Sequence, residues 1–384
     1  MARTLRSDKL LFVATLLLVG TSILMVYSAS SFLAMTKYHQ SPYYFLFKQL
    51  AWAVIGLIAL AITMKIDYRL YRQPAVIWVG LIGVFLALVA VLFMPARNGT
   101  SRWFGIGSMT VQPSEFAKII LIIFSAALLE RRMHRIADVK YSLGPILIAT
   151  GILVALVLKE PDFGTSVAIL TIVGAMIFSA GLSYRYLVGG FLIVAPALAI
   201  YAISAPYRWR RLVSFLDPWA SQLGDGYQVV QSFIAIGSGG IFGRGLMGSI
   251  AKQSFLPEPH TDFIAAIIAE ELGLVGITLL IIAFLIITWR GLRAAVLAPD
   301  RFGTLLGIGL TTMIAVQAFI NLSVVTGLFP NKGMPLPFVS NGGSSLVINL
   351  LGMGILLNIS QQASTVAAVK TGVDPDALSA SRRE

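Results

Sequence analysis

A short stretch with two prolines is the part of the sequence best suited to acid-base chemistry. It reads Leu256-Pro257-Glu258-Pro259-His260-Thr261-Asp262, and an apolar segment follows from Phe263. The prolines prevent a regular helix here, which leaves Glu258, His260 and Asp262 as candidate site residues. Asp262 has a second explanation, because Thr and Asp are favourable N-caps for a helix that begins at Phe263. A catalytic carboxylate and a structural cap are both open at this point.

Glu270 is a further acidic candidate, within the apolar segment itself. If that segment is one helix, Glu270 lies about 12 Å along it from Asp262 and on roughly the same face, at about 1.5 Å per residue. The sequence continues Glu271-Leu272-Gly273. An unpaired charge at membrane depth costs several kcal/mol, so an ionisable residue there indicates a functional site.

A third group, Gln112-Pro113-Ser114-Glu115-Phe116-Ala117-Lys118, opens another apolar segment. Glu115 and Lys118 share one helix face, so they could pair with each other or line a common polar cavity. The alternative is that Lys118 extends its amine to the membrane surface from a helix end. Just before this group, Arg102 and Trp103 are expected at the outer interface, where a Trp often serves only as a membrane anchor.

The fourth group is a loop too rich in Gly and Pro to be helical. It reads Asn331-Lys332-Gly333-Met334-Pro335-Leu336-Pro337-Phe338-Val339-Ser340-Asn341-Gly342-Gly343-Ser344-Ser345. Irregular backbone between two membrane helices is tolerated where it lines a protein cavity or water. Its N–H and hydroxyl groups, with Lys332 as the charge, suit an anion. The alternative is a simple reversing loop.

Composition limits what these groups can belong to. Of the 384 residues, 57% are hydrophobic and only 12% are charged, which indicates a membrane protein and excludes a soluble enzyme. The net charge of +12 comes from Lys and Arg spread through the loops, which argues against nucleic acid as a partner. The chain has no cysteine, so disulfides and thiol chemistry are excluded. No metal site is evident, although a Mg²⁺ ion on a substrate pyrophosphate would leave little trace.

About ten apolar stretches are long enough to cross a membrane, which takes about 20 residues. They cover residues 10–33, 45–64, 75–94, 113–129, 142–158, 164–181, 185–203, 263–288, 303–328 and 344–363. The first could pass for a secretory signal, but its apolar run continues to Leu33, which favours an uncleaved helix. The short loops richest in Lys and Arg are expected in the cytoplasm, which places both termini there.

The longest segment between these stretches, residues 204–262, is expected to be extracytoplasmic, between the seventh and eighth helices. Its middle, Tyr227 to Ile236, is apolar but too short to span, and glycines between residues 237 and 245 break any continuous helix. A partly re-entrant or interfacial segment fits best. Residues 1–370 are expected to form one transmembrane domain, with 371–384 as a disordered cytoplasmic tail.

The chain resembles the SEDS family, the cell-wall polymerases of shape, elongation, division and sporulation. The resemblance rests on the stretches around Glu115, Asp262, Glu270 and Ser340 quoted above, and it runs from about the first helix to the last. Ser214-Phe215-Leu216-Asp217-Pro218-Trp219, Gly224-Asp225-Gly226-Tyr227-Gln228 and Lys332-Gly333 are more similar to the division branch than to the elongation branch. Asn341 departs from the pattern, because the family usually has Tyr there.

The resemblance implies an all-α polytopic membrane protein that polymerises lipid II at the outer face of the bacterial cytoplasmic membrane, at the division septum. The implied partners are a class B penicillin-binding protein and other division proteins. Asp262 matches the carboxylate on which the family's activity depends. A base for the attacking hydroxyl and cations for the pyrophosphate suit this reaction, whereas a glycosidase would need two carboxylates around the bond.

The expected site can then be stated in full. Asp262 is the expected catalytic base, and the expected substrate contacts are Arg102, Trp103, Glu115, Lys118, Arg211, Glu258, His260, Glu270, Lys332, Ser340 and Ser344. Lys332 and its loop are expected to hold the pyrophosphate as it leaves. Glu115 and Lys118 are expected to line a cavity near Asp262.

Two other functions are open at this stage. A flippase that moves lipid II across the bilayer would also use intramembrane charges, but the sequence shows no evident pair of repeated halves with broken helices. A scaffold that only activates a partner enzyme is the other alternative. Polymerisation by purified protein in detergent, where no leaflets exist, separates the three.

Overall fold

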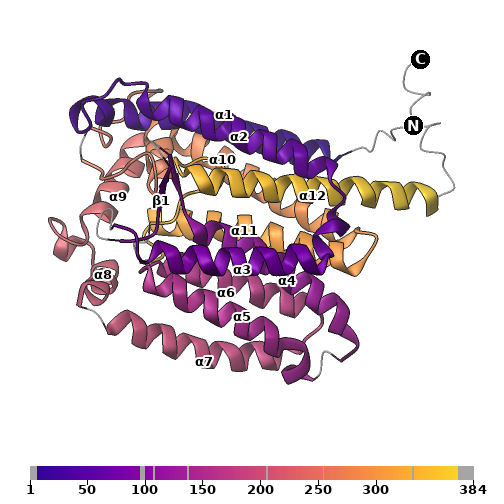
Figure 1. The fold of residues 1–384 in the computed structure, drawn as a ribbon. Helices are drawn as coiled ribbons and strands as arrows, with labels where there is room; N and C mark the ends of the chain where they lie inside the picture. The colour runs from indigo at the N-terminus through magenta and orange to yellow at the C-terminus, as the bar shows by residue number, and fades with distance from the viewer. Residues whose placement is uncertain are drawn as a thin grey trace, which may run out of the picture.

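The computed structural model describes residues 7–95, 100–106, 109–135, 138–204, 206–253, 255–330 and 333–370. Within them, long helices lie roughly side by side as a bundle (Figure 1). The long helices are α1 (Lys9–Thr36), α2 (Tyr44–Lys65), α3 (Pro74–Val91), α4 (Pro113–Arg132), α5 (Val139–Lys159), α6 (Phe163–Ser179), α7 (Tyr184–Ile203), α10 (Ile264–Val296), α11 (Arg301–Val325) and α12 (Gly343–Lys370). The shorter elements are η1 (Tyr68–Arg72), β1 (Phe104–Ile106), β2 (Met109–Val111), η2 (Met133–Arg135), α8 (Pro206–Leu216), η3 (Trp219–Ser221) and α9 (Tyr227–Gly239).

Each apolar stretch predicted from the sequence coincides with one of the long helices. Eight of them are long and apolar enough to cross a membrane by length and composition. The two others are α6, which is short for a span at 17 residues, and α4, which carries Glu115 and Lys118 in its first turns. The polytopic helical fold is therefore confirmed. The all-α fold class is confirmed as well, and β1 and β2 add a small antiparallel hairpin in which Phe104 lies opposite Val111.

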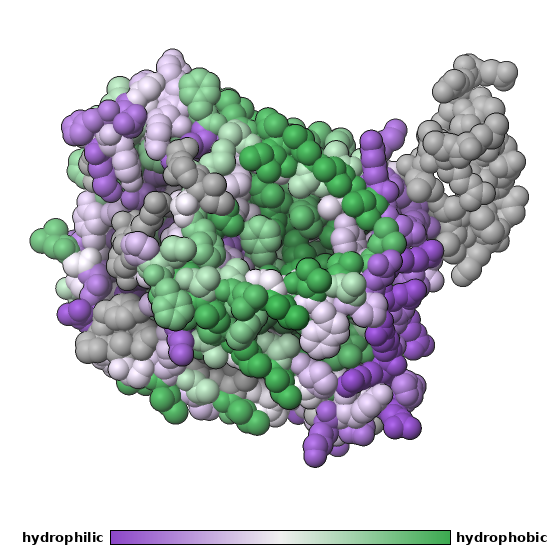
Figure 2. All heavy atoms as spheres, in the orientation of Figure 1, coloured by the Kyte–Doolittle hydropathy of each residue, from purple (hydrophilic) through white to green (hydrophobic). Residues whose placement is uncertain are grey.

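The chain ends of the bundle lie together. Asp8, the N-cap of α1, donates its backbone N–H to Ser360 Oγ on α12 at 3.2 Å and accepts from Arg290 Nε on α10 at 2.7 Å. Hydrophilic residues gather at this end and hydrophobic residues cover the middle of the face shown in Figure 2. Helices α1 and α12 therefore begin and end on the same side, as expected. That this side is cytoplasmic stays a prediction.

Hydropathy divides the helices into an inner and an outer set, with the exception of α7, whose span has a hydropathy of 1.5 and is 0% buried. Helices α3 and α10 have the highest hydropathy, 2.6, and only 22% of each span is buried within the protein. Helix α12 has a hydropathy of 1.6 and is 83% buried. Lipid rather than water surrounds such a bundle, so the most apolar helices belong outside and the helices with polar side chains belong inside. Helix α12 accordingly packs against α2, α4, α10 and α11.

Helix α10 is interrupted, which the sequence analysis did not predict. Gly273 has φ 67° and ψ −162°, so the helix stops after Leu272 and restarts at Leu274. At about 1.5 Å per residue the break lies about 14 Å from the start of α10. The segment after α9 crosses α10 at this break, and its Ile241, Phe242 and Leu246 are exposed where lipid would be. This crossing supports the partly re-entrant segment, which stays a prediction.

The crossing supplies the hydrogen bonds that the broken helix loses. A helix end leaves carbonyl and N–H groups without partners, and in lipid no water can satisfy them. Two carbonyls before the break accept from the crossing segment, and two N–H groups after it donate to that segment. The four bonds are Arg244 N to Glu270 O (3.0 Å), Gly245 N to Glu271 O (3.0 Å), Leu274 N to Gly240 O (2.9 Å) and Val275 N to Ile241 O (3.2 Å).

Gly273→Ala tests this crossing. A Cβ on Gly273 would lie 2.3 Å from Gly243 N and 2.4 Å from Ile241 O, and its positive φ is unfavourable for Ala. We expect a loss of about 1–3 kcal/mol in stability, measured as a lower temperature of unfolding in detergent. The matched control is Gly151→Ala in α5, where a Cβ meets nothing within 4 Å. An equal effect of the two substitutions would contradict the close approach.

Candidate active site

The proline-rich loop lies directly on the stretch that contains Asp262. Ser340 Oγ donates to Thr261 O at 2.5 Å, and Asn341 N donates to His260 O at 2.9 Å. Asn321 of α11 joins the two segments from below, since its Nδ2 donates to Asp262 O at 2.8 Å and to Met334 O at 2.7 Å. Two groups that the sequence analysis treated separately therefore form one surface.

The carboxylate of Asp262 is not a helix cap. Helix α10 begins at Ile264 with Phe263 as its N-cap, and no side chain caps it. Among the described residues no hydrogen bond reaches the carboxylate, and Asp262 is half-buried. A Cβ placed on Gly333 would lie 2.7 Å from Asp262 Oδ2, so the backbone of the proline-rich loop passes beside this oxygen. The structural explanation of Asp262 is therefore wrong, and a carboxylate without a structural role remains.

The surroundings of Asp262 make it a weaker acid than usual. Burial, followed by the charges of Glu258 and Asp162, raises its pKa to about 7. The guanidinium groups of Arg102 and Arg211 act in the opposite direction. A carboxylate whose pKa is close to neutral pH can accept a proton and release it again, as a general base must.

Asp162 connects the group around Gln112 to this site. Its carboxylate caps α6, because Oδ1 accepts from Thr165 N at 3.1 Å and Oδ2 accepts from Gln112 Nε2 at 2.9 Å. The backbone N–H of Gln112 in turn donates to Ser344 Oγ at 3.2 Å. Sequence reasoning missed Asp162, although a Pro-Asp pair followed by Thr165 is a recognisable helix start.

Arg102 lies just before β1 and contacts the turn between α5 and α6. Its Nε donates to Glu160 O at 2.6 Å and its Nη2 donates to Pro161 O at 2.7 Å. The carboxylate of Glu160 is buried, and neither oxygen has a hydrogen-bond partner. Burial, followed by the charge of Asp162, raises the pKa of Glu160 to about 8, while Arg102 lowers it. Glu160 is thus a neutral acid at pH 7, and it was also missed from the sequence.

His260 and Glu258 border the site without sharing one role. His260 is buried against Phe45 of α2, with ring centres 4.5 Å apart. Burial lowers the pKa of His260 to about 4, so its ring is neutral at pH 7. Glu258 is partly exposed and pairs with Lys37 of α1 at 3.3 Å. Glu258 can therefore contact a substrate from solvent, whereas His260 cannot do so without moving.

Glu115 and Lys118 form a closed pair inside the bundle. Lys118 Nζ lies 2.8 Å from both carboxylate oxygens of Glu115, and the two side chains are 1% and 3% exposed. Lys118 therefore does not reach toward the membrane surface, which contradicts the alternative of a helix-end anchor. That the pair lines a cavity near Asp262 stays a prediction.

Glu270 is held by the crossing segment. Its carboxylate accepts from Ser249 Oγ at 2.5 Å, from Ile250 N at 2.9 Å and from Ala251 N at 3.3 Å. The donors come from the loop that leads to Asp262, so the structure gives Glu270 a positioning role. Its contact with substrate stays a prediction.

Glu271 holds the same loop from the next position. It accepts from Lys252 Nζ at 2.8 Å, from Ser28 Oγ of α1 at 2.6 Å and from Met247 N at 3.1 Å. Sequence reasoning missed Lys252 and Ser28 as its partners, although a lone Lys near membrane depth is itself a signal. We refer to Ser28, Lys252, Glu270 and Glu271 as the carboxylate anchor.

The remaining predicted site residues either lie near Asp262 and the proline-rich loop or fall outside the residues that the structure describes. Trp103 is half-buried beside Arg102, and Arg211 is exposed on α8. Lys332 and the predicted tail 371–384 lie outside the described residues. Ser340 and Ser344 are buried and already bonded, to Thr261 O and to Gln112 N. They position the loop, and direct contact with substrate stays a prediction for them.

The groups that meet here are the ones on which the family resemblance rests. The sequence profile of the FtsW/RodA/SpoVE family, described as cell cycle protein, matches residues 8–365. The chain belongs to this family. The match begins before α1 and ends within α12, so it includes the residues of the candidate site.

Curated relatives are similar over nearly the whole chain. A probable peptidoglycan glycosyltransferase FtsW of Geobacter metallireducens is 40% identical over 359 residues, which are 92% of this chain and 95% of the relative. Stage V sporulation protein E of Bacillus subtilis is 42% identical over 359 residues, 92% and 97% of the two chains.

Solved structures share the fold. One neighbour is a chain of a peptidoglycan synthase complex that coordinates polymerization and crosslinking. It superposes with a TM-score of 0.75 at 29% identity, and the superposition covers 93% of this chain and 98% of the neighbour. The rod shape determining protein RodA of Thermus thermophilus gives a TM-score of 0.68 at 27% identity, with 93% and 97% covered.

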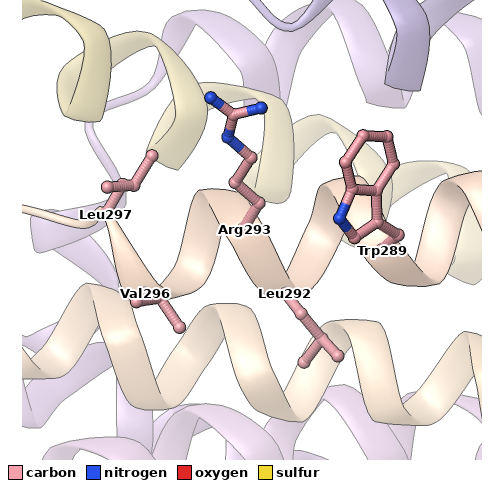
Figure 3. A pocket seen from close by; sticks show the side chains of 5 residues that line it. All are labelled: Trp289, Leu292, Arg293, Val296 and Leu297. Carbon is pink, nitrogen blue, oxygen red and sulfur yellow. The ribbon is translucent and has the colours of Figure 1, made fainter.

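One cavity of about 370 Å³ lies far from this site. It is lined by Trp289, Leu292, Arg293, Val296 and Leu297 near the end of α10 (Figure 3). Asp262 precedes the start of the same helix, so the cavity is at the opposite end of the bundle. It has no part in the chemistry of Asp262.

Lys252→Met tests the carboxylate anchor. The change leaves Glu271 buried and charged without its cation, which costs about 3–5 kcal/mol for a buried pair. Adding Glu271→Gln should recover part of that loss, because the uncompensated charge is gone. The matched control is Lys37→Met, whose pair with Glu258 is exposed and should contribute at most about 1 kcal/mol. The measurement is thermal unfolding in detergent. Equal losses in the single and double variants would exclude a coupled pair.

Proposed function

We propose that this protein is a peptidoglycan glycosyltransferase that polymerises lipid II at the outer face of the cytoplasmic membrane, with Asp262 as the general base. The observation that carries the proposal is the state of Asp262. Its carboxylate has no structural bond among the described residues, has a pKa raised to about 7, and lies where the proline-rich loop meets the start of α10. The enzyme class agrees with the names of the curated relatives.

The reaction needs few groups. A sugar hydroxyl of one chain attacks the anomeric carbon that carries the lipid pyrophosphate, the bond to the pyrophosphate breaks, and the hydroxyl proton passes to Asp262. The pyrophosphate leaves as an anion, so it needs cations more than a proton. Arg102 and Arg211 act on Asp262 electrostatically and are therefore near enough to supply charge. Lys332 lies outside the described residues, and we propose it as a further cation for the leaving group because it precedes Gly333 in the sequence.

A divalent cation would depend mainly on the substrate. The described residues contain no group of three or more His, Cys, Asp and Glu that could hold a metal ion. Mg²⁺ is commonly held by one or two carboxylates and by phosphate oxygens. Glu160, whose oxygens lack partners among the described residues, could make such a contact only after losing its proton, because its pKa is about 8.

We further propose a division role with a class B penicillin-binding protein and other division proteins as partners, at the septal inner membrane. The relatives named FtsW support it. The structural neighbour from a peptidoglycan synthase complex supports a partner that carries out crosslinking. The similarity to a sporulation protein is as high, so the growth programme rests on the names alone.

A flippase is the second candidate, and one observation favours it. Helix α10 is broken and crossed by another segment at membrane depth, which is a feature of transporters. One broken helix is not the pair of broken helices in repeated halves that the usual transporter plan has. At this break, however, the carboxylates of Glu270 and Glu271 are already bonded to the loop. Formation of polymer in detergent, where no leaflets exist, would show that the protein acts as a polymerase and not only as a flippase.

Asp262→Asn should lower polymerisation by about 100-fold to 10,000-fold, the usual contribution of a general base. The unfolding temperature should stay the same, because the carboxylate accepts no hydrogen bond from the residues that the structure describes. The assay is glycan chain formation from lipid II by purified protein with its partner. Asp225→Asn, an exposed acid in the same long loop, is the control and should keep its activity. A near-normal rate of polymer formation by the Asp262→Asn variant would refute the hypothesis that Asp262 is the general base.

The pH dependence of the maximal rate should follow Asp262. The base works only when ionised, so the rate should fall about tenfold per pH unit below a midpoint near its pKa of about 7. Arg211 lowers this pKa, so Arg211→Gln should move the midpoint to higher pH, and Glu258→Gln should move it to lower pH. Arg210→Gln is the matched control and should leave the midpoint in place. If neither substitution moves the midpoint, the pH dependence of the maximal rate does not come from Asp262.

A further inference from the structure

Helix α8 has one apolar face that the protein leaves uncovered. Trp209, Val213 and Leu216 recur at helical spacing on this face, and all three are exposed. The face of α8 that carries Ser214 packs against the protein, because Ser214 is buried. Among the described elements, helix α8 packs mainly against α7 and η3. In water such a face would be costly, so something apolar must cover it.

The position of α8 in the chain indicates what covers it. Helix α7 ends at Ile203 and α8 begins at Pro206, so α8 starts where a membrane span ends. Its 11 residues cover about 16 Å, which is too short to cross a bilayer. A helix in that place with one apolar face lies along the interface. Trp209 and the exposed Trp219 of η3 are residues of the kind that gather at this level.

The polar side of α8 is basic, and α8 lies at the end of the bundle that holds β1 (Figure 1). The helix contains three Arg and no acidic residue. Arg210 makes an exposed pair with Asp225 at 3.6 Å. The charge of Arg211 acts on Asp262. Cations at the level of the lipid headgroups, beside the site, complement a phosphate-bearing lipid.

We propose that α8 lies in the outer-leaflet interface with Trp209, Val213 and Leu216 in the lipid, and that Arg210 and Arg211 bind the pyrophosphate of the lipid-linked substrate as it enters from the bilayer. The first part depends on the structure and on the predicted orientation of the bundle in the membrane. The second part rests on the proposed function. A lipid substrate cannot leave the membrane, so an entry helix at headgroup depth shortens its path to Asp262 and orients the anion first.

The depth of α8 can be measured because the chain has no cysteine. Single Cys substitutions at Trp209, Val213 and Leu216 would carry an environment-sensitive fluorophore in full-length protein in phosphatidylglycerol-containing liposomes. We expect blue-shifted emission at these three positions and strong quenching by lipids with a spin label near the headgroup. The polar-face position Arg210 should instead be quenched by aqueous iodide.

Two reference labels calibrate the result. Leu192→Cys on the exposed face of α7 represents the bilayer interior, and Asp225→Cys in the loop represents water. The interface position is overturned if the labels at 209, 213 and 216 respond to iodide like the label at 225. It is also overturned if they become shielded only when the partner protein is added, which would make this face a protein contact.

The role in substrate entry is tested by kinetics in two environments. The Trp209→Asp/Leu216→Asp variant should raise the half-saturation concentration of lipid II at least fivefold in liposomes. Its maximal rate should stay within twofold, and in detergent micelles both values should match the wild type. An unchanged half-saturation point in liposomes overturns the entry role. The fluorescence result does not depend on activity, so failure of the proposed function and failure of this proposal are distinguishable.

Discussion

The structure depends on one constraint, that a polar group at membrane depth must find its partner within the protein. The break at Gly273 would leave the carbonyls before it and the N–H groups after it without partners, and the segment after α9 supplies all four described bonds. The carboxylate anchor extends the same principle to side chains, because Glu270 and Glu271 take loop N–H groups, Lys252 and Ser28 as partners. The loop that reaches Asp262 is thereby fixed to α1 and α10 together.

Against this background, the unsatisfied groups indicate function. Most buried polar groups around the site are bonded, including Asp162, Ser340 and Ser344. Buried atoms of Glu160, His260 and Asn321 lack partners among the described residues, and so does the half-buried carboxylate of Asp262. Burial raises the pKa of both carboxyl groups, Asp262 and Glu160. Strained or unsatisfied groups persist only where the surrounding structure holds them. The bonded groups around Asp262 therefore hold the loop in place, and the loop holds the carboxylate of Asp262 in a position that its own contacts do not stabilise.

The site also joins parts of the chain that are distant in sequence. Gln112 opens α4, Asp162 caps α6, Asp262 precedes α10 and Ser344 opens α12. Each lies at a helix end, and in a bundle of alternating direction such ends meet at one face. A lipid-linked substrate at the outer leaflet would encounter this face without either partner crossing the bilayer. The basic side of α8 lies at the same level, which links access from the membrane to the chemistry at Asp262.

The sequence by itself determined the spans, the chain ends on one side and the groups around Glu115, Asp262 and Ser340, because hydropathy over about 20 residues is a local property and the motifs are contiguous. Only the tertiary structure decided which groups meet. Asp262 could have been a cap until α10 was seen to begin without one, and Glu270 seemed an unpaired charge until the loop residues around Ile250 were found on it. The break at Gly273 was equally invisible, since a glycine in an apolar run is compatible with a continuous helix. Pairing between segments is a non-local property, and a single sequence contains no record of which partner satisfies which group.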